Sequence, residues 1–171
     1  MYKISNVKLS LKIQYVCLDT VQKQLELKSI KYKSYNNFIV FKNVYTFILF
    51  KSKDKERNHL NVTNIKTVED RVNVIEVFKI STLGDNISIL SVNIDNITAS
   101  FKILKAFNFT GILNKFISLA KVTYNSEKFP GVFLKFDCGT VILFHTGNCI
   151  IIGCKVIENI QWLMNQIHVN I

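Results

Sequence analysis

Proline, glycine and arginine are scarce in this sequence. Its 171 residues include one proline and six glycines, which argues against a collagen-like, linker-rich or low-complexity protein. Apolar residues make up 49% and charged residues 20%, the composition of a globular chain. Of the 22 basic residues only Arg57 and Arg71 are arginine, and lysine suits phosphate contacts better than bidentate recognition of base edges. The net charge of +10 favours a polyanionic partner.

Signals for secretion, membrane insertion and catalysis are also missing. The most apolar stretch, Phe129–Ile157, is interrupted by charged and polar residues and falls short of the roughly 18 apolar residues of a spanning helix. The four cysteines form no C-x-x-C pair, and we expect reduced, intracellular thiols. His145, Cys149 and Cys154 match no standard zinc spacing, and no phosphate-binding loop, nucleophile elbow or paired-carboxylate motif appears. We therefore expect no metal, no cofactor and no enzymatic activity.

The chain contains an internal repeat, which shows as three recurring landmarks. They are a strand with an asparagine, a pair of aromatic residues 15 positions apart, and a strand that closes on a lysine. Their offsets between the copies are 90, 94 and 89 residues. The landmarks are Ile4–Val7 and Ile94–Ile97, Tyr35 with Phe50 and Phe129 with Phe144, and Val62–Lys66 and Ile151–Lys155.

Each copy predicts the element order β-α-β-β-β-α, with residues 1–83 as the first copy and 84–171 as the second. Two such copies predict an α+β fold, with one long antiparallel sheet and all helices on one face. The uncovered face would be broadly apolar, which usually marks a binding site. Thr67 followed by Asp70 predicts a capped start for the last helix of the first copy. The expected strands are 3–13, 38–42, 45–51, 60–65, 94–104, 131–136, 140–145 and 148–154, and the expected helices are 18–27, 68–78, 111–120 and 156–167.

Several segments resemble the TATA-box-binding protein family. In the second copy these are Lys128-Phe129-Pro130-Gly131-Val132, Val141–Gly147 and Gly153-Cys154-Lys155-Val156. The resemblance covers essentially the whole chain. It is specific in the second copy and weaker in the first, where Tyr35, Asn36 and Asn37 replace a phenylalanine and small residues of the family.

The resemblance implies a saddle-shaped protein, whose curved antiparallel sheet carries the helices on its convex face and lies with its concave face on the DNA minor groove. Four aromatic residues would then open base steps, and one asparagine per copy would donate to adenine N3 and thymine O2. The residues that the resemblance assigns to DNA binding are Asn6, Tyr35, Phe50, Val62, Thr63, Asn96, Phe129, Lys135, Phe144 and Ile151.

The sequence also departs from the family pattern. Ile152 stands where the first copy keeps Thr63, and Lys135 replaces a phosphate-contacting arginine whose counterpart in the first copy is Phe41, with Lys42 adjacent. Without the repeat, Phe50, Phe129 and Phe144 would be interpreted as core residues. Asn6 and Asn96 would be interpreted as bulge or turn residues.

We expect a transcription initiation factor that binds and bends A·T-rich promoter DNA and recruits a factor IIB-like protein and RNA polymerase. It would act in a nucleus or a viral replication compartment, since the diverged first copy and the A+T-rich codon usage suggest a viral or fast-evolving source. A first alternative is a degenerate saddle that serves as a protein-interaction subunit of a transcription assembly. A second is an accessory substrate-binding domain of a nucleic-acid enzyme, although no catalytic domain follows in this sequence.

Overall fold

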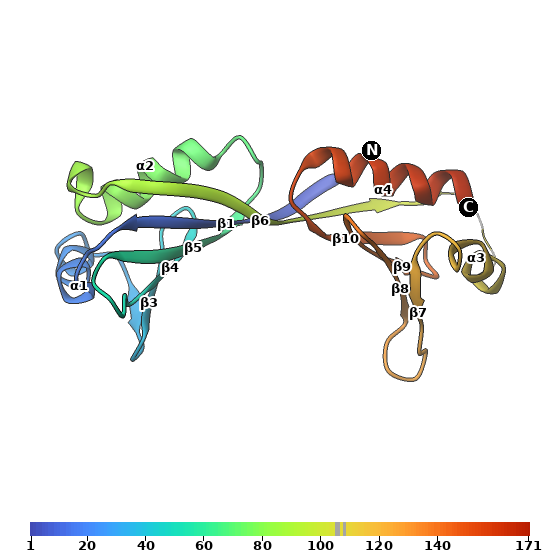
Figure 1. Cartoon of the computed structure of the whole chain (residues 1–171), viewed down its shortest axis with the longest axis horizontal. Helices are drawn as coiled ribbons and strands as arrows, with labels where there is room; N and C mark the ends of the chain where they lie inside the picture. The colour runs from blue at the N-terminus through green and yellow to red at the C-terminus, as the bar shows by residue number, and fades with distance from the viewer. Residues whose placement is uncertain (105–106, 108) are drawn as a thin grey trace. The chain divides into compact units, whose positions relative to one another are not determined.

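The computed structural model describes residues 1–104, 107 and 109–171, and these contain ten strands and four α-helices (Figure 1). The strands form one open antiparallel sheet, hydrogen-bonded in the order β2-β3-β4-β5-β1-β6-β10-β9-β8-β7. The chain divides into two compact units. Residues 6–94 form what we term the N-terminal unit, and residues 1–5 with 95–171 form the C-terminal unit.

The elements follow the same order in both halves of the chain. The first half contains β1 (Lys3–Gln14), α1 (Leu18–Leu27), β2 (Tyr32–Ser34), β3 (Phe38–Lys42), β4 (Thr46–Phe50), β5 (Arg57–Ile65) and α2 (Arg71–Ser81). After a short 3-10 turn at Gly84–Asn86 come β6 (Ile89–Lys102), α3 (Phe109–Phe116), β7 (Lys121–Thr123), β8 (Gly131–Phe136), β9 (Gly139–Phe144), β10 (Asn148–Cys154) and α4 (Ile157–Asn170).

The core of the N-terminal unit lies between its helices and one face of its strands. Alternate residues of β1, from Val7 to Ile13, are buried, while the residues between them are partly or fully exposed. On α2, Phe78 packs against Phe41 of β3 and Phe47 of β4, with ring centroids 6.3 and 5.7 Å apart. Because side chains alternate across a strand, this helix covers only one face.

The C-terminal unit is built in the same way around Phe136 of β8. Its ring meets Phe116 of α3 edge-on at 6.4 Å and Trp162 of α4 edge-on at 5.6 Å. On β6, Phe101 stacks on His168 of α4 at 5.5 Å. Both helices of this unit therefore pack on the face of the strands that carries Phe101 and Phe136.

The expected elements are confirmed in type and order, apart from small differences in their limits. Two edge strands were not expected: β2 and β7 are three residues long, too short to show alternation in the sequence. The predicted cap at Thr67 is wrong. Helix α2 begins at Arg71 after Asp70, and no side-chain hydrogen bond caps it.

The two units do not coincide with the two repeats expected from the sequence. In the C-terminal unit, the hydroxyl of Ser5 at the start of β1 donates to the carbonyl of Thr98 on β6 at 3.1 Å. In the N-terminal unit, the N–H of Gln14 donates to the carbonyl of Ser88, just before β6, at 2.9 Å. Strands β1 and β6 therefore each contribute residues to both units.

The four cysteines are free thiols. Cys149 and Cys154 are buried, and burial raises their pKa to about 12 and about 11, so both stay protonated at neutral pH. Cys17 is exposed. Among the described residues no group of histidine, cysteine and carboxylate side chains could hold a metal ion, and no helix is long and apolar enough to cross a membrane.

A buried asparagine generates a prediction about stability. Asn58 of β5 is fully buried, accepts from the N–H of Val16 at 2.7 Å and donates to the carbonyl of Phe50 at 2.9 Å. Asn58→Ala leaves two backbone groups without these partners, so we expect the free energy of unfolding in urea to fall by about 2 kcal/mol or more. The matched control Asn61→Ala, on the partly exposed face of the same strand, should change it by less than about 0.5 kcal/mol. Equal losses in the two variants would contradict this role.

Candidate nucleic-acid interface

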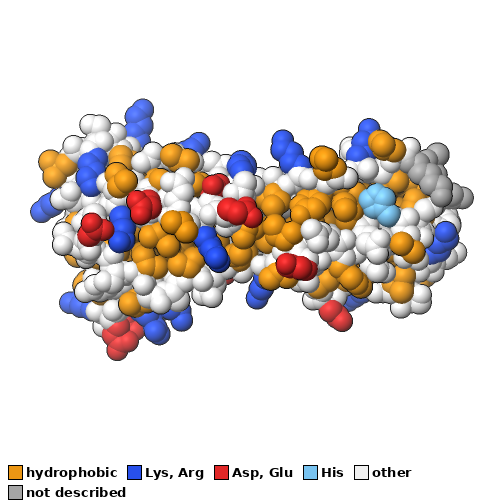
Figure 2. Space-filling view, turned by 90° about the horizontal axis from the view of Figure 1, so that it is seen from above, with side chains coloured by type: hydrophobic (Ala, Val, Ile, Leu, Met, Phe, Trp, Pro, Cys, Tyr) orange, Lys and Arg blue, Asp and Glu red, His pale blue; other side chains and the backbone are white. Residues whose placement is uncertain are grey.

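In each unit the described helices pack on one face of the strands, and the described strand residues of the other face carry charges of one sign. We call it the uncovered face. Among the described strand residues that alternate with the buried ones, it carries lysine, arginine and histidine but no aspartate or glutamate. Helices α1 and α2 carry acidic and basic residues together. The side of the molecule seen in Figure 2 likewise shows side chains of both signs. The uncovered face therefore has the electrostatics for a polyanion.

Asn6 and Asn96 occupy equivalent places on the uncovered faces of their units. The side-chain oxygen of Asn6 accepts from the N–H of Asn64 at 2.9 Å, and that of Asn96 accepts from the N–H of Gly153 at 2.6 Å. Since the oxygen is bound to the backbone in both cases, the amide NH2 group is the part left to donate. At Asn96 it contacts the Thr98 hydroxyl at 3.2 Å, which leaves its second hydrogen for another acceptor.

The backbone that holds these two asparagines is irregular in the same way in both units. Asn64 and Gly153 have φ angles of 66° and 85°, in the left-handed region. The strand register shifts nearby, between Val7 and Leu9 and between Ile151 and Cys154. The bulge turns one N–H toward the asparagine oxygen, so the orientation of each amide is fixed by the backbone of its neighbouring strand.

Three aromatic rings meet at the end of the uncovered face in the C-terminal unit. Phe129, 37% exposed, lies 5.2 Å from Phe133 and 5.7 Å from Phe144, measured between ring centroids. Gly131 makes this contact possible, because a Cβ there would lie 2.7 Å from Cε1 of Phe129 and 3.2 Å from Cε1 of Phe144. The sequence-predicted pair of this copy is therefore in contact and partly accessible.

The N-terminal unit also gathers three rings at the end of its uncovered face, but in another arrangement. Tyr35, 49% exposed, stacks on Phe38 at 4.5 Å, and Phe38 lies 5.7 Å from Phe50. Phe38 was not among the predicted site residues. The strand register could have found it, since Phe38 pairs directly with Phe50 across β3 and β4.

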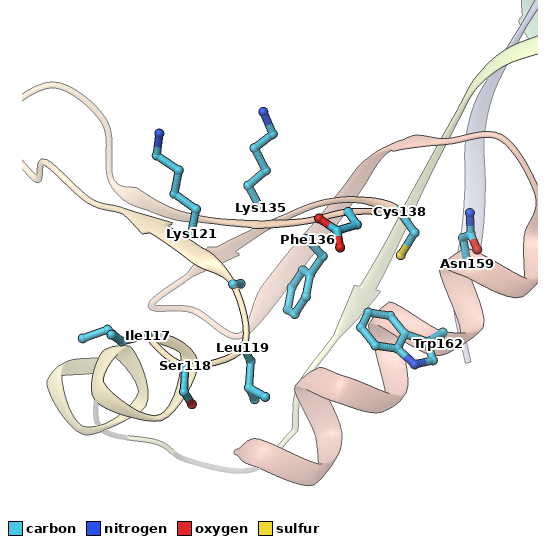
Figure 3. Close-up of a pocket in the computed structure, with 11 residues that line it drawn as sticks. Ile117, Ser118, Leu119, Lys121, Lys135, Phe136, Cys138, Asn159 and Trp162 are labelled. Atoms are coloured by element: carbon cyan, nitrogen blue, oxygen red, sulfur yellow. The ribbon is translucent and has the colours of Figure 1, made fainter.

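A pair of lysines marks the outer strands of the C-terminal unit. Lys135 of β8 and Lys121 of β7 are directly opposite each other in the sheet, and both project to the same side, as Figure 3 shows. Phe136, the next residue, projects to the other side, toward an open pocket of about 1020 Å³ bordered by Leu119 and Trp162. Two like charges placed side by side repel each other, and a bound anion would relieve the repulsion.

The comparisons with known proteins agree with this geometry. Residues 91–171 match the sequence model of a family described as transcription factor TFIID, or TATA-binding protein. The solved structure of Methanococcus jannaschii TBP is similar over 99% of this chain and 97% of its own, with a TM-score of 0.77 and 22% sequence identity. Residues 91–171 thus carry the sequence pattern of the TATA-binding protein family, and the described chain has the fold of that protein. The α+β fold class expected from the sequence is confirmed by the likeness to this structure.

Other comparisons add nothing to this assignment. An aspartate kinase of Clostridium acetobutylicum matches 91% of this chain and 31% of its own length at 10% identity, with a TM-score of 0.27, which is too low to carry an argument. No curated protein matches the sequence.

Two residues that the family resemblance assigned to DNA are misplaced for that role. The side chains of Val62 and Ile151 are fully buried, because strand alternation turns them toward the helices. Their neighbours face the other way: Thr63 is opposite Thr46, and Ile152 is opposite Thr140. The apolar side chain of Ile152 thus stands where the N-terminal unit has a hydroxyl.

The counterpart of Lys135 is also corrected. Phe41, the counterpart assigned from the sequence, is 1% exposed and packs under α2. Lys42 is exposed and pairs with Thr46, just as Lys135 pairs with Thr140. The one-residue error arose because the copies differ in the length of the connection between these strands.

The paired lysines generate a prediction that needs no DNA. Lys135→Gln removes the repulsion with Lys121, so we expect the free energy of unfolding to rise by about 0.5 kcal/mol at low salt and the gain to shrink as salt screens the charges. The control is Lys102→Gln, whose cross-strand neighbour is the neutral Asn148. Urea unfolding at two salt concentrations measures the effect. A gain that is the same in both variants, or insensitive to salt, would count against the pair.

Proposed function

We propose that this protein is a transcription initiation factor that binds A·T-rich promoter DNA through the minor groove and bends it. The observation that carries the proposal is the composition of the uncovered face in each unit. An asparagine amide, a cluster of aromatic rings and exposed lysines occupy equivalent places there, with no acidic side chain among the described strand residues that alternate with the buried ones. This set of groups fits a widened, unstacked duplex.

The asparagines supply the preference for A·T base pairs. In the minor groove A·T and T·A both present acceptors, adenine N3 and thymine O2, whereas guanine adds an obstructing amino group. The amides of Asn6 and Asn96 have their oxygens bound to the backbone, so they offer donors. A fixed donor reads A·T against G·C without distinguishing A·T from T·A.

The aromatic clusters supply the bend. Phe129 and Phe144 form a partly exposed apolar contact that can enter an opened base step and replace lost base stacking with ring contact. Insertion of apolar side chains from the minor groove is the mode of binding for which this family is the type example. Pyrimidine–purine steps such as TA yield most easily, which adds an indirect preference for A·T-rich sites.

The lysines supply affinity for the phosphate backbone of the DNA. Lys135 and Lys42 lie at equivalent register positions on the outer strands of their units, and Lys121 adds a second charge beside Lys135. Neutralising phosphates with lysine releases counterions, so the affinity should fall steeply with salt. This electrostatic attraction does not depend on the DNA sequence, so the asparagine amides and the aromatic rings supply the sequence preference.

Protein partners would bind the helix-bearing side. Helix α2 exposes Val72 and Ile80 at 66% each, and α4 exposes Trp162 and Val169 at 47% and 73%. We propose a factor IIB-like protein and RNA polymerase as the partners that the DNA-bound factor recruits, in a nucleus or a viral replication compartment. The match of residues 91–171 to the family model supports this part of the proposal.

A second candidate is a protein-interaction subunit of a transcription assembly with weak DNA binding of its own. Two observations favour it. Ile152 replaces the hydroxyl that Thr63 presents in the other unit, and the connection before β3 is only residues 35–37, whereas residues 124–130 precede β8. Both changes reduce the contacts available to a duplex.

Binding to short duplexes separates the two candidates. We expect the protein to hold and bend an A·T-rich duplex, so that energy transfer between dyes on its two ends rises, and to bind a G·C-rich duplex much more weakly. Phe129→Ala with Phe144→Ala should remove the part of the bend that arises at the C-terminal unit and leave the thermal unfolding midpoint nearly unchanged, because both side chains are partly exposed.

Two other results would contradict the first candidate. Salt-sensitive binding of any sequence without a bend would mean a basic surface only. Binding that requires an added transcription factor would favour the second candidate. Bending that is undiminished in the double variant would refute the role of the two phenylalanines.

Asn96→Asp tests the amide separately from the fold. Aspartate keeps an oxygen to accept from the N–H of Gly153, but it replaces the donor with a second oxygen and a negative charge. We expect an unchanged unfolding midpoint and at least tenfold weaker binding to the A·T-rich duplex, measured by fluorescence anisotropy. Asn148→Asp, on the neighbouring strand, controls for the added charge. An equal loss from both substitutions would mean that charge alone accounts for it.

A further inference from the structure

Strand register shows that the residue equivalent to Gly131 is Phe38. Gly131 pairs with Phe144 across β8 and β9, and Phe38 pairs with Phe50 across β3 and β4. The equivalence is fixed at the other end of the same strands, where Lys135 pairs with Thr140 and Lys42 with Thr46. The N-terminal unit thus has a phenylalanine at the position where the C-terminal unit has no side chain.

The equal spacing of the aromatic pairs in the sequence hides this difference. Tyr35 precedes the strand residue opposite Phe50 by three positions, whereas Phe129 precedes the residue opposite Phe144 by two. Between the paired positions, the segment from Phe38 to Phe50 is one residue shorter than the segment from Gly131 to Phe144, which restores the total. Tyr35 therefore matches Phe129 in spacing but not in register.

We propose that Phe38, rather than Tyr35, is the ring that works with Phe50 to open a base step at the N-terminal unit. This inference rests on the proposed function and names a residue outside the family-derived set. It makes the two aromatic clusters chemically unequal, with two rings in direct contact over a glycine in one unit and a third ring between the pair in the other.

The backbone around Phe38 suits a wedge better than that around Tyr35. Phe38 is a strand residue whose direction is fixed by its pairing with Phe50, and its carbonyl accepts from the N–H of Tyr35 at 2.9 Å. Tyr35 lies in the short connection after β2, outside the ladder. An inserted side chain gains most when its orientation is set before binding.

Tyr35 has a different role in this arrangement. Its ring stacks on Phe38 at 4.5 Å with an interplanar angle of 22°, so it supports one face of Phe38. It also carries a hydroxyl, which is costly to bury between bases without a partner. Tyr35 is thus a positioning residue, and Phe38 is the residue that contacts the base.

The experiment uses the full chain and an A·T-rich duplex with 2-aminopurine, whose fluorescence rises when it unstacks, at one end of the site or the other. Phe129→Ala identifies the signal of the C-terminal unit. We expect Phe38→Ala to remove the remaining rise and to weaken binding about 5- to 100-fold, the range for loss of one base–aromatic stack. Tyr35→Ala should keep most of the rise and weaken binding less than about threefold.

Two further variants keep the test decisive. Phe38→Leu keeps an apolar side chain without a flat face and should lose the rise with an unchanged unfolding midpoint. Val40→Ala, at the next position of the same face of β3, is the matched control: it also removes apolar surface from this face but no ring, so it should keep the rise. If Phe38→Leu retains the full rise, or Tyr35→Ala removes as much of it as Phe38→Ala, the assignment is wrong. A wild-type protein that gives no rise at either end contradicts the proposed function itself.

Discussion

The arrangement of this protein depends on the alternation of side chains across its strands, with helices available for only one face. Burial of the phenylalanines under α2 and around Phe136 stabilises one side of each unit. The opposite side is then free to carry residues that serve binding. A shift of one residue in a strand would exchange the two sets, so the hydrophobic core and the proposed binding surface constrain each other.

The sequence predicted the fold well, because the repeat landmarks and the apolar runs keep their spacing when the strands pair. It predicted the site less well. Val62 and Ile151 were assigned to DNA, although the alternation of side chains along their strands places them in the core. Phe41 was chosen over Lys42 by a shift of one residue. To assign a residue to one face of a strand, the strand register must be known. The register depends on the hairpin lengths, and these differ between the copies.

The edge strands and the bulges could not be predicted from the sequence, for other physical reasons. A three-residue strand such as β2 shows no period. The left-handed conformation of Asn64 has no unambiguous sequence signal, although glycine at the equivalent position, Gly153, is typical of it. The sequence identified Asn6 and Asn96 by their matched placement. It could not show that the backbone of the neighbouring strand holds their oxygens.

The exchange of strand ends between the units has a consequence for how such a protein could evolve. Residues 1–5 belong with the second half of the chain, and residues 84–94 of the second repeat belong with the first. A gene fragment that encodes one repeat alone would lack part of a strand from its own compact unit. Loss of either copy would therefore remove strand residues from the compact unit that the other copy mainly forms.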